Sequence, residues 1–181
     1  HERSRRQRQM CIRDSTKVKL IHAKLLMSKF QYQAASDYLQ ANLSNNKEEP
    51  VAELKAILFG QIGDFNNAFI QASYLTEKWP ENLAYQIIRA DIAVRLGRNE
   101  EATEIVNKAL RLEPNHLGAR VVKARIAFQQ DKRPVAIELL ESVVKEKRDS
   151  LSALLLLGQI YTLEGQFDLA VDRLLIAKAL N

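Results

Sequence analysis

Small and apolar residues recur along this chain at a fixed interval of 34 residues. Three columns carry the interval most clearly: Ala68, Ala102, Ala136 and Ala170; Ala56, Ala90, Ala124 and Gly158; and Gly63, Gly97 and Gly165, with Asp131 where a fourth glycine would stand. A period between 20 and 50 residues is typical of an array of small, similar structural units. The chain therefore folds, we expect, as a repeat array in which each unit buries its apolar face against its neighbours.

Each unit has the pattern of two amphipathic helices. In residues 83–116, apolar residues follow helical spacing up to Leu96, Gly97 breaks the pattern, and a second apolar stripe runs from Ala102 to Leu112. Six glycines and four prolines in 181 residues also favour long helices over a β-sandwich. The prediction is an all-α array of about five helical hairpins, with boundaries at 16–48, 49–82, 83–116, 117–150 and 151–181.

The recurring columns have a mechanical meaning. A small residue in the middle of the first helix and another early in the second let the two helix axes approach closely. An aromatic residue stands just before the second helix in three units, as Tyr32, Phe65 and Phe167. We expect each of these rings to wedge the turn against the core.

The first fifteen residues do not follow the repeat. HERSRRQRQMCIRDS has no helical or strand periodicity and contains the only cysteine, Cys11. We predict that residues 1–15 are a non-native or disordered lead segment that resembles a translated sequencing scar. The alternative is a basic arm that binds nucleic acid or membrane.

The lead segment also carries most of the positive charge. Its five arginines against Glu2 and Asp14 give +3 of the total net charge of +5, which leaves 22 basic against 20 acidic residues in 16–181. The near balance in the repeat region gives no electrostatic reason for a polyanionic partner.

At this level of detail the repeat resembles a known family. The order small-x-x-Tyr/Phe/Ala, then Gly-x-Phe-x-x-Ala, then Ala-Leu-x-Leu-x-Pro at period 34 resembles the tetratricopeptide repeat, and LLLLGQIYTLEGQFDLAVDRLLIAKAL of the fifth unit matches closely. The resemblance covers about residues 16–181 and implies a right-handed α-α superhelix, or solenoid. The run LEPNHLGARVVKARIAFQQDKRPVAIELL is also similar to repeats of bacterial envelope and exopolysaccharide-export proteins.

The family resemblance further implies where a partner binds. In the family the first helix of each unit lines the concave groove, and partners dock there. The groove candidates are the fifth and ninth residues of each unit: Leu20, Lys24, Glu53, Ile57, Ile87, Asp91, Val121, Arg125, Leu155 and Gln159. This set lacks the Lys/Asn clamp of chaperone-binding relatives and suits an amphipathic helix or an extended apolar segment.

A purely structural interpretation of the same residues competes with binding. Ile87, Val121 and Leu155 stand at positions where packing between helices is the commoner role. Asp91 and Arg125 are polar and one repeat apart, so they are the better binding candidates, and a surface ion pair explains them equally well.

The sequence offers no catalytic, metal or cofactor motif. His22 and His116 stand alone, the glutamate pairs lie at helix starts or on solvated faces, and there is no phosphate loop or nucleophile elbow. We therefore predict a non-catalytic scaffold that binds a protein or peptide, with no cofactor, no nucleic acid and no membrane span. Two alternatives remain: an RNA-binding helical repeat, and the recruiting arm of a multidomain enzyme.

The sequence fits more than one cellular compartment. One cysteine excludes an intrachain disulfide but fits the cytoplasm as well as the periplasm or envelope. Because the chain begins with His and ends within the apolar pattern of the fifth unit, we expect it to be a fragment of a larger bacterial protein.

Overall fold

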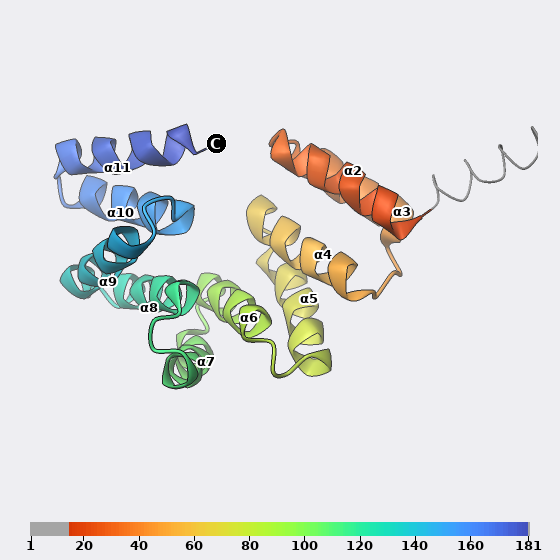
Figure 1. Ribbon diagram of the computed structural model, residues 1–181, viewed down its shortest axis with the longest axis horizontal. Helices are drawn as coiled ribbons and strands as arrows, with labels where there is room; N and C mark the ends of the chain where they lie inside the picture. The colour runs from red at the N-terminus through yellow and green to blue at the C-terminus, as the bar shows by residue number, and fades with distance from the viewer. Residues whose placement is uncertain (1–14, 181) are drawn as a thin grey trace, which may run out of the picture. The chain divides into compact units, whose positions relative to one another are not determined.

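The computed structural model describes residues 15–180, which form ten α-helices and no β-strand (Figure 1). The predictions for the arginine-rich lead and Cys11 fall on residues 1–14 and lie outside the described part. The helices are α2 (Thr16–Ser28), α3 (Tyr32–Leu43), α4 (Glu49–Ile62), α5 (Phe65–Lys78), α6 (Leu83–Arg95), α7 (Asn99–Leu112), α8 (Leu117–Gln129), α9 (Arg133–Glu146), α10 (Leu151–Leu163) and α11 (Phe167–Ala179). Two helices fall within each of the five sequence ranges. The all-α repeat fold is confirmed.

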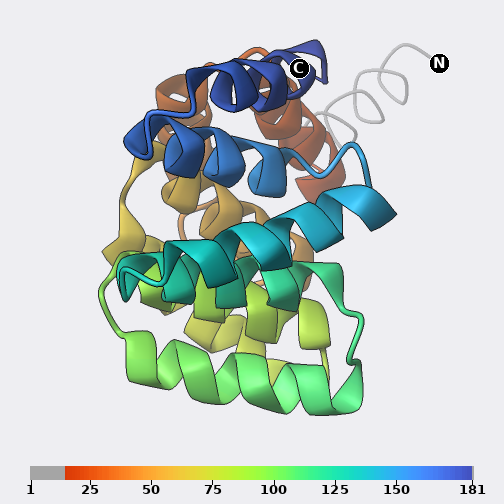
Figure 2. The same cartoon turned by 90° about the vertical axis from the view of Figure 1, so that its left-hand side faces the viewer.

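The chain divides into two compact units, one ending at Ile92 and the other beginning at Ala93. The division falls inside α6, and thus inside the third hairpin. The first unit holds a core built from α2, α3 and α4 around Leu39 and Leu58. The second holds a core built from α8 to α11 around Leu140 and Leu157. Within the second unit, α7 to α11 follow one another in space in chain order, from green to dark blue in Figure 2.

The small-residue columns lie where the two helices of a hairpin meet. Ala68, Ala102 and Ala136 are fully buried and Ala170 is 3 % exposed. In the first-helix column, Gly158 replaces alanine, and a Cβ there would lie 2.6 Å from Leu174 of α11. The helices of this hairpin therefore approach so closely that glycine is the residue that fits without displacing Leu174.

A left-handed residue reverses the chain in all five hairpins. Gly63, Gly97 and Gly165 have φ of 84°, 75° and 72°, and Asp131, which stands in the glycine column, has φ of 59°. The same bond from an N–H to the carbonyl five residues earlier closes every turn: Gln31 to Leu26, Asp64 to Phe59, Arg98 to Ala93, Lys132 to Ala127 and Gln166 to Tyr161, each at 2.9 or 3.0 Å. This bond is the mark of a Schellman cap, which needs a left-handed residue just before its donor.

The first hairpin meets this requirement with Phe30, whose φ is 58°. Phe30 lies 33 residues before Gly63, and sequence reasoning did not place it in the column. The wedge prediction needs a correction at Phe167, which is 64 % exposed. Tyr32 and Phe65 are half-buried, whereas α11 is the last helix described and no following hairpin covers Phe167. The prediction for that ring is wrong.

Candidate binding surfaces

The predicted groove residues divide into a buried and an exposed set. In the fifth-residue row, Leu20 and Ile87 are 8 % exposed and Val121 is 6 % exposed. Leu20 belongs to the core of the first unit and Val121 to that of the second. These three side chains therefore contribute to packing, while Glu53 is half-buried and Leu155 is 47 % exposed.

The ninth-residue row is more accessible. Lys24, Ile57 and Gln159 are exposed, and Asp91 and Arg125 are half-buried. Within the first unit α2 and α4 are in contact, which places Lys24 and Ile57 on neighbouring helices.

Within the second unit, α8 and α10 are in contact in the same way, which places Arg125 and Leu155 on neighbouring helices. Ile87 and Asp91 lie on α6 in the first unit. Each unit thus presents its own predicted groove residues, and among these one large apolar residue is exposed in each unit, Ile57 in the first and Leu155 in the second.

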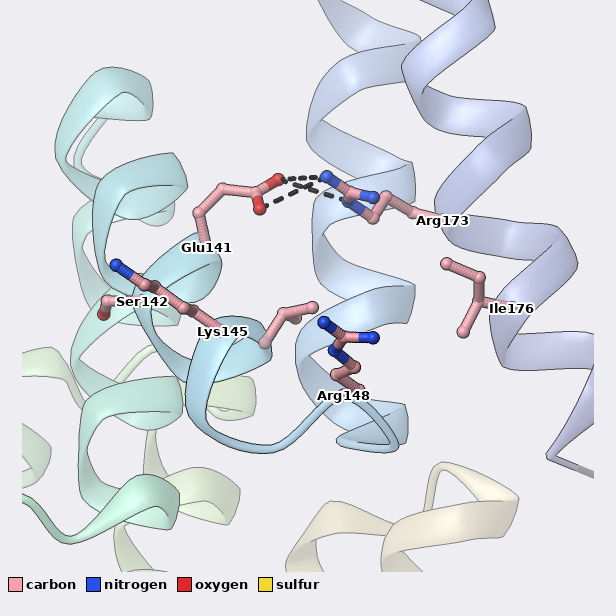
Figure 3. A pocket seen from close by; sticks show the side chains of 7 residues that line it. Glu141, Ser142, Lys145, Arg148, Arg173 and Ile176 are labelled. Carbon is pink, nitrogen blue, oxygen red and sulfur yellow. Dashed lines mark hydrogen bonds and ion pairs between the residues drawn. The ribbon is translucent and has the colours of Figure 1, made fainter.

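A groove between second helices was not foreseen from the sequence. It lies between α9 and α11 and has a volume of about 620 Å³ (Figure 3). It is lined by Glu141, Ser142, Val144, Lys145, Arg148, Arg173 and Ile176. Figure 3 shows Arg173 of α11 reaching across to Glu141 of α9. The Arg173 Nη2 atom lies 3.1 Å from Glu141 Oε1 and the Nε atom lies 3.2 Å from the same oxygen.

The same carboxylate also accepts a hydrogen bond from a third helix. The Tyr161 hydroxyl, on α10, donates to Glu141 Oε1 at 2.9 Å. Burial, and then this hydrogen bond, raises the pKa of Tyr161 to about 12. Glu141 therefore links three helices, α9, α10 and α11, and its charge is neutralised by Arg173.

Two cations of this groove have no such partner. The nearby carboxylate of Glu146 is paired with Arg120 of α8. Lys145 and Arg148 are exposed, and neither side chain has a hydrogen bond or ion pair within residues 15–180. They stand beside Val144 and Ile176, so the groove offers an apolar surface with two free positive charges. An acidic, partly apolar segment fits that chemistry.

A second groove, of about 510 Å³, lies between α3 and α5 in the first unit. Its floor includes Lys55 of α4, which is only 7 % exposed. The Nζ atom donates to the carbonyls of Leu43 at 2.6 Å and Ser44 at 2.9 Å. These are orphan carbonyls at the end of α3, so Lys55 acts as a C-terminal cap.

Burial lowers the pKa of Lys55, because the cation has left water without a carboxylate partner. Sequence reasoning missed this cap. A cation precedes the small residue in three units, as Lys55, Arg89 and Lys123, but Lys123 is exposed, so this column alone does not predict a cap.

The isolated histidines have structural positions. His22 stacks on Tyr38 with ring centroids 4.4 Å apart. His116 Nδ1 accepts a hydrogen bond from the Ala119 N–H at 3.1 Å and caps the start of α8. No group of three or more His, Cys, Asp or Glu side chains that could hold a metal occurs within the described residues. None of the described helices has the length and apolar character that crossing a bilayer requires.

Comparison with known proteins adds family and fold information. Two sequence models described as tetratricopeptide repeat match residues 84–116 and 121–180, about half of the chain. No curated protein matches the sequence. Among solved structures, TTC0263, a thermophilic TPR protein of Thermus thermophilus, has 18 % identity and a TM-score of 0.73, with 90 % of both chains covered.

Two further structures share the fold. The type IV pilus biogenesis factor PilW has 18 % identity and a TM-score of 0.63, covering 91 % of this chain and 76 % of its own. YrrB, a TPR protein with an unusual peptide-binding site, has 15 % identity and a TM-score of 0.54, covering 93 % and 88 %. At these identities the likeness shows the solenoid fold alone.

Proposed function

The chain belongs to the tetratricopeptide repeat family, and on that premise we propose that it is a non-catalytic module that binds a segment of another protein. Solenoids of this kind offer extended surfaces on which partners dock, and proteins of the family generally mediate protein–protein interaction. The observation that carries the proposal is the exposed apolar side chain on the first-helix face of each unit, Ile57 at 38 % and Leu155 at 47 %.

The proposed docking surface is this first-helix face. In the first unit the polar members of this face are exposed Lys24 and half-buried Glu53 and Asp91, and in the second unit they are exposed Gln159 and half-buried Arg125. An amphipathic helix or extended segment would bury its apolar residues against Ile57 or Leu155 and leave its polar side facing these groups.

A peptide selection tests the surface. Peptides selected from a displayed random library on the 181-residue chain should bind at least about tenfold more weakly to Leu155→Glu or Ile57→Glu, because a charge replaces the apolar contact. Leu169→Glu on α11 is the matched control, since Leu169 is 43 % exposed but lies on a second helix. Equal affinity for all three variants would refute docking on the first-helix face.

The groove between α9 and α11 supports a second binding mode. Its free Lys145 and Arg148 beside Val144 and Ile176 favour a segment that carries carboxylates among apolar residues. Selected peptides that are acidic and lose affinity on Lys145→Glu with Arg148→Glu, but not on Leu155→Glu, would move the proposed site to this groove.

The finer predictions from the sequence stay proposals. An RNA-binding array is the other class, and it requires tight, salt-sensitive RNA affinity from residues 16–181 alone. We expect no such RNA binding, measured by fluorescence anisotropy with a labelled single-stranded RNA in 50 mM and 200 mM salt.

Two other proposals depend on the reading frame around these 181 residues. They are that the chain is the recruiting arm of an enzyme, and that it belongs to the envelope or exopolysaccharide-export group. Sequencing of the locus would test both.

A further inference from the structure

The repeat lets one position be compared across all five hairpins, and two first-helix columns change their burial at one end. One column is apolar throughout and reads Ile21, Leu54, Ile88, Val122 and Leu156. Leu54, Val122 and Leu156 are 3 to 5 % exposed, whereas Ile21 is 66 % exposed. Ile88 is half-buried, so the column is covered or partly covered in the later hairpins and open in α2.

The next turn of the first helix repeats this difference. The column reads Leu25, Leu58, Ile92, Ile126 and Ile160. Its last four members are 0 to 6 % exposed, whereas Leu25 is 51 % exposed. Ile21 and Leu25 are four residues apart and share one face of α2, which we name the α2 end face.

In the second helices, one column is buried in the first four hairpins and exposed in the last. The column Leu39, Ala72, Val106, Leu140 and Leu174 is at most 2 % exposed in its first four members and 40 % exposed at Leu174. Val171, three residues earlier on the same face, is 54 % exposed, while its equivalent Ile137 packs against the core. Leu174 and Val171 form the α11 end face.

Inside the chain these columns meet each other. Leu140 of α9 lies in one buried cluster with Leu156 and Ile160 of α10. Leu39 of α3 lies in one buried cluster with Leu54 and Leu58 of α4.

At these two junctions the second-helix column of one hairpin shares a buried cluster with both first-helix columns of the next, and the two helices are in contact. The α2 and α11 end faces carry the two halves of that contact, and both are exposed in the part of the chain that the structure describes.

We propose that two copies of this chain associate head to tail, with the α2 end face of one copy packed on the α11 end face of the other. The occupant is a second copy because the chain itself supplies both halves, in the register that its internal hairpins already use. A contact between two different faces is heterologous, so it leaves a free face at each end and permits further addition. The proposal is independent of which surface binds a partner.

Sedimentation velocity of the 181-residue chain across a concentration series tests the association. We expect the weight-average sedimentation coefficient to rise with concentration. Leu25→Glu and Leu174→Glu should each remain monomeric, with at least about tenfold weaker association, because a charge would be buried in the contact. Their equimolar mixture should form dimers that grow no further, since it retains one intact α2 face and one intact α11 face.

Controls separate association from folding. Leu169 lies on α11, and its equivalent one repeat earlier, Val135, is also exposed, at 47 %, so this column is not covered by a following hairpin. Leu169→Glu should therefore associate like the parent chain. Leu174 also packs near Gly158, so Val171→Glu serves as a second variant if Leu174→Glu loses helical circular dichroism.

Three results would overturn the proposal. The first is a parent chain that stays monomeric up to several hundred micromolar. The second is self-association of Leu25→Glu equal to the parent, which would indicate a symmetric contact through α11. The third is a mixture of the two variants that remains monomeric, which would show that the faces bind another partner or an adjoining segment of a longer chain.

Discussion

Two glycines in the same hairpin should respond to alanine in opposite directions. Gly60 lies within α4, whereas Gly63 follows α4 with φ of 84°. Apart from its own chain neighbours and the adjacent helix backbone, an added Cβ would meet no atom within 4 Å at either position. Because neither substitution creates a clash with neighbours, the backbone conformation alone decides the sign.

The magnitudes follow from that conformation. Gly60→Ala should stabilise by about 0.5–1 kcal/mol, the usual gain from replacing glycine inside a helix. At Gly63 the left-handed conformation costs an L-residue about 1–2 kcal/mol. The reduced freedom of the unfolded chain returns about 0.4–1 kcal/mol. The net expectation is a loss of about 1 kcal/mol, or roughly 2–4 °C in the melting temperature.

The single tryptophan gives a local readout. Trp79 lies between Tyr74 and Tyr85 in the first unit, with ring centroids 6.4 and 6.2 Å away. Urea unfolding followed by Trp79 fluorescence therefore reports on the unit that holds both glycines, which matters because repeat arrays need not unfold in one step. A Gly63→Ala variant as stable as Gly60→Ala would refute the assignment of a left-handed cap at residue 63.

Three further outcomes are expected. Ala136→Leu should lower the unfolding free energy by about 1–3 kcal/mol through overpacking, measured by thermal circular dichroism, while Val135→Leu on the same helix, 47 % exposed, should change it little; equal melting of both would contradict the column assignment. Asp131→Gly should raise the unfolding free energy by a few tenths to about 1 kcal/mol, because glycine adopts the left-handed φ of 59° without strain. The ion pair to Arg133 that is lost is exposed, so its loss should cost little. A lower unfolding free energy in urea titration would contradict the strain at residue 131. In the folded protein the pKa of Tyr161 is raised from 10.0 to about 12, so the neutral hydroxyl contributes to the unfolding free energy fully below pH 10, and this contribution is lost as pH rises towards 12. In urea titrations from pH 9 to 11.5, the unfolding free energy of Tyr161→Phe should therefore fall less with pH than that of the parent chain. An equal fall in both proteins would contradict the raised pKa.

The sequence predicted the features that depend on one residue and its near neighbours. The alanine columns lie at buried positions, and Asp131, which the period placed in the glycine column, has the left-handed backbone of the glycines in that column. Helical spacing and turn chemistry are local, so the 34-residue period carries them directly. The left-handed backbone at Phe30 was not predicted, because a phenylalanine side chain does not indicate that conformation.

Only the tertiary structure decided which apolar positions are covered. Val121 and Leu155 stand in one column, yet one is 6 % and the other 47 % exposed. Ile21 and Leu174 likewise differ from their equivalents, most of which are buried, and Glu146 of α9 pairs with Arg120 of α8. A periodic pattern gives every hairpin the same residues, but burial and charge pairing depend on which neighbouring helix is present, and that is a property of position in the array.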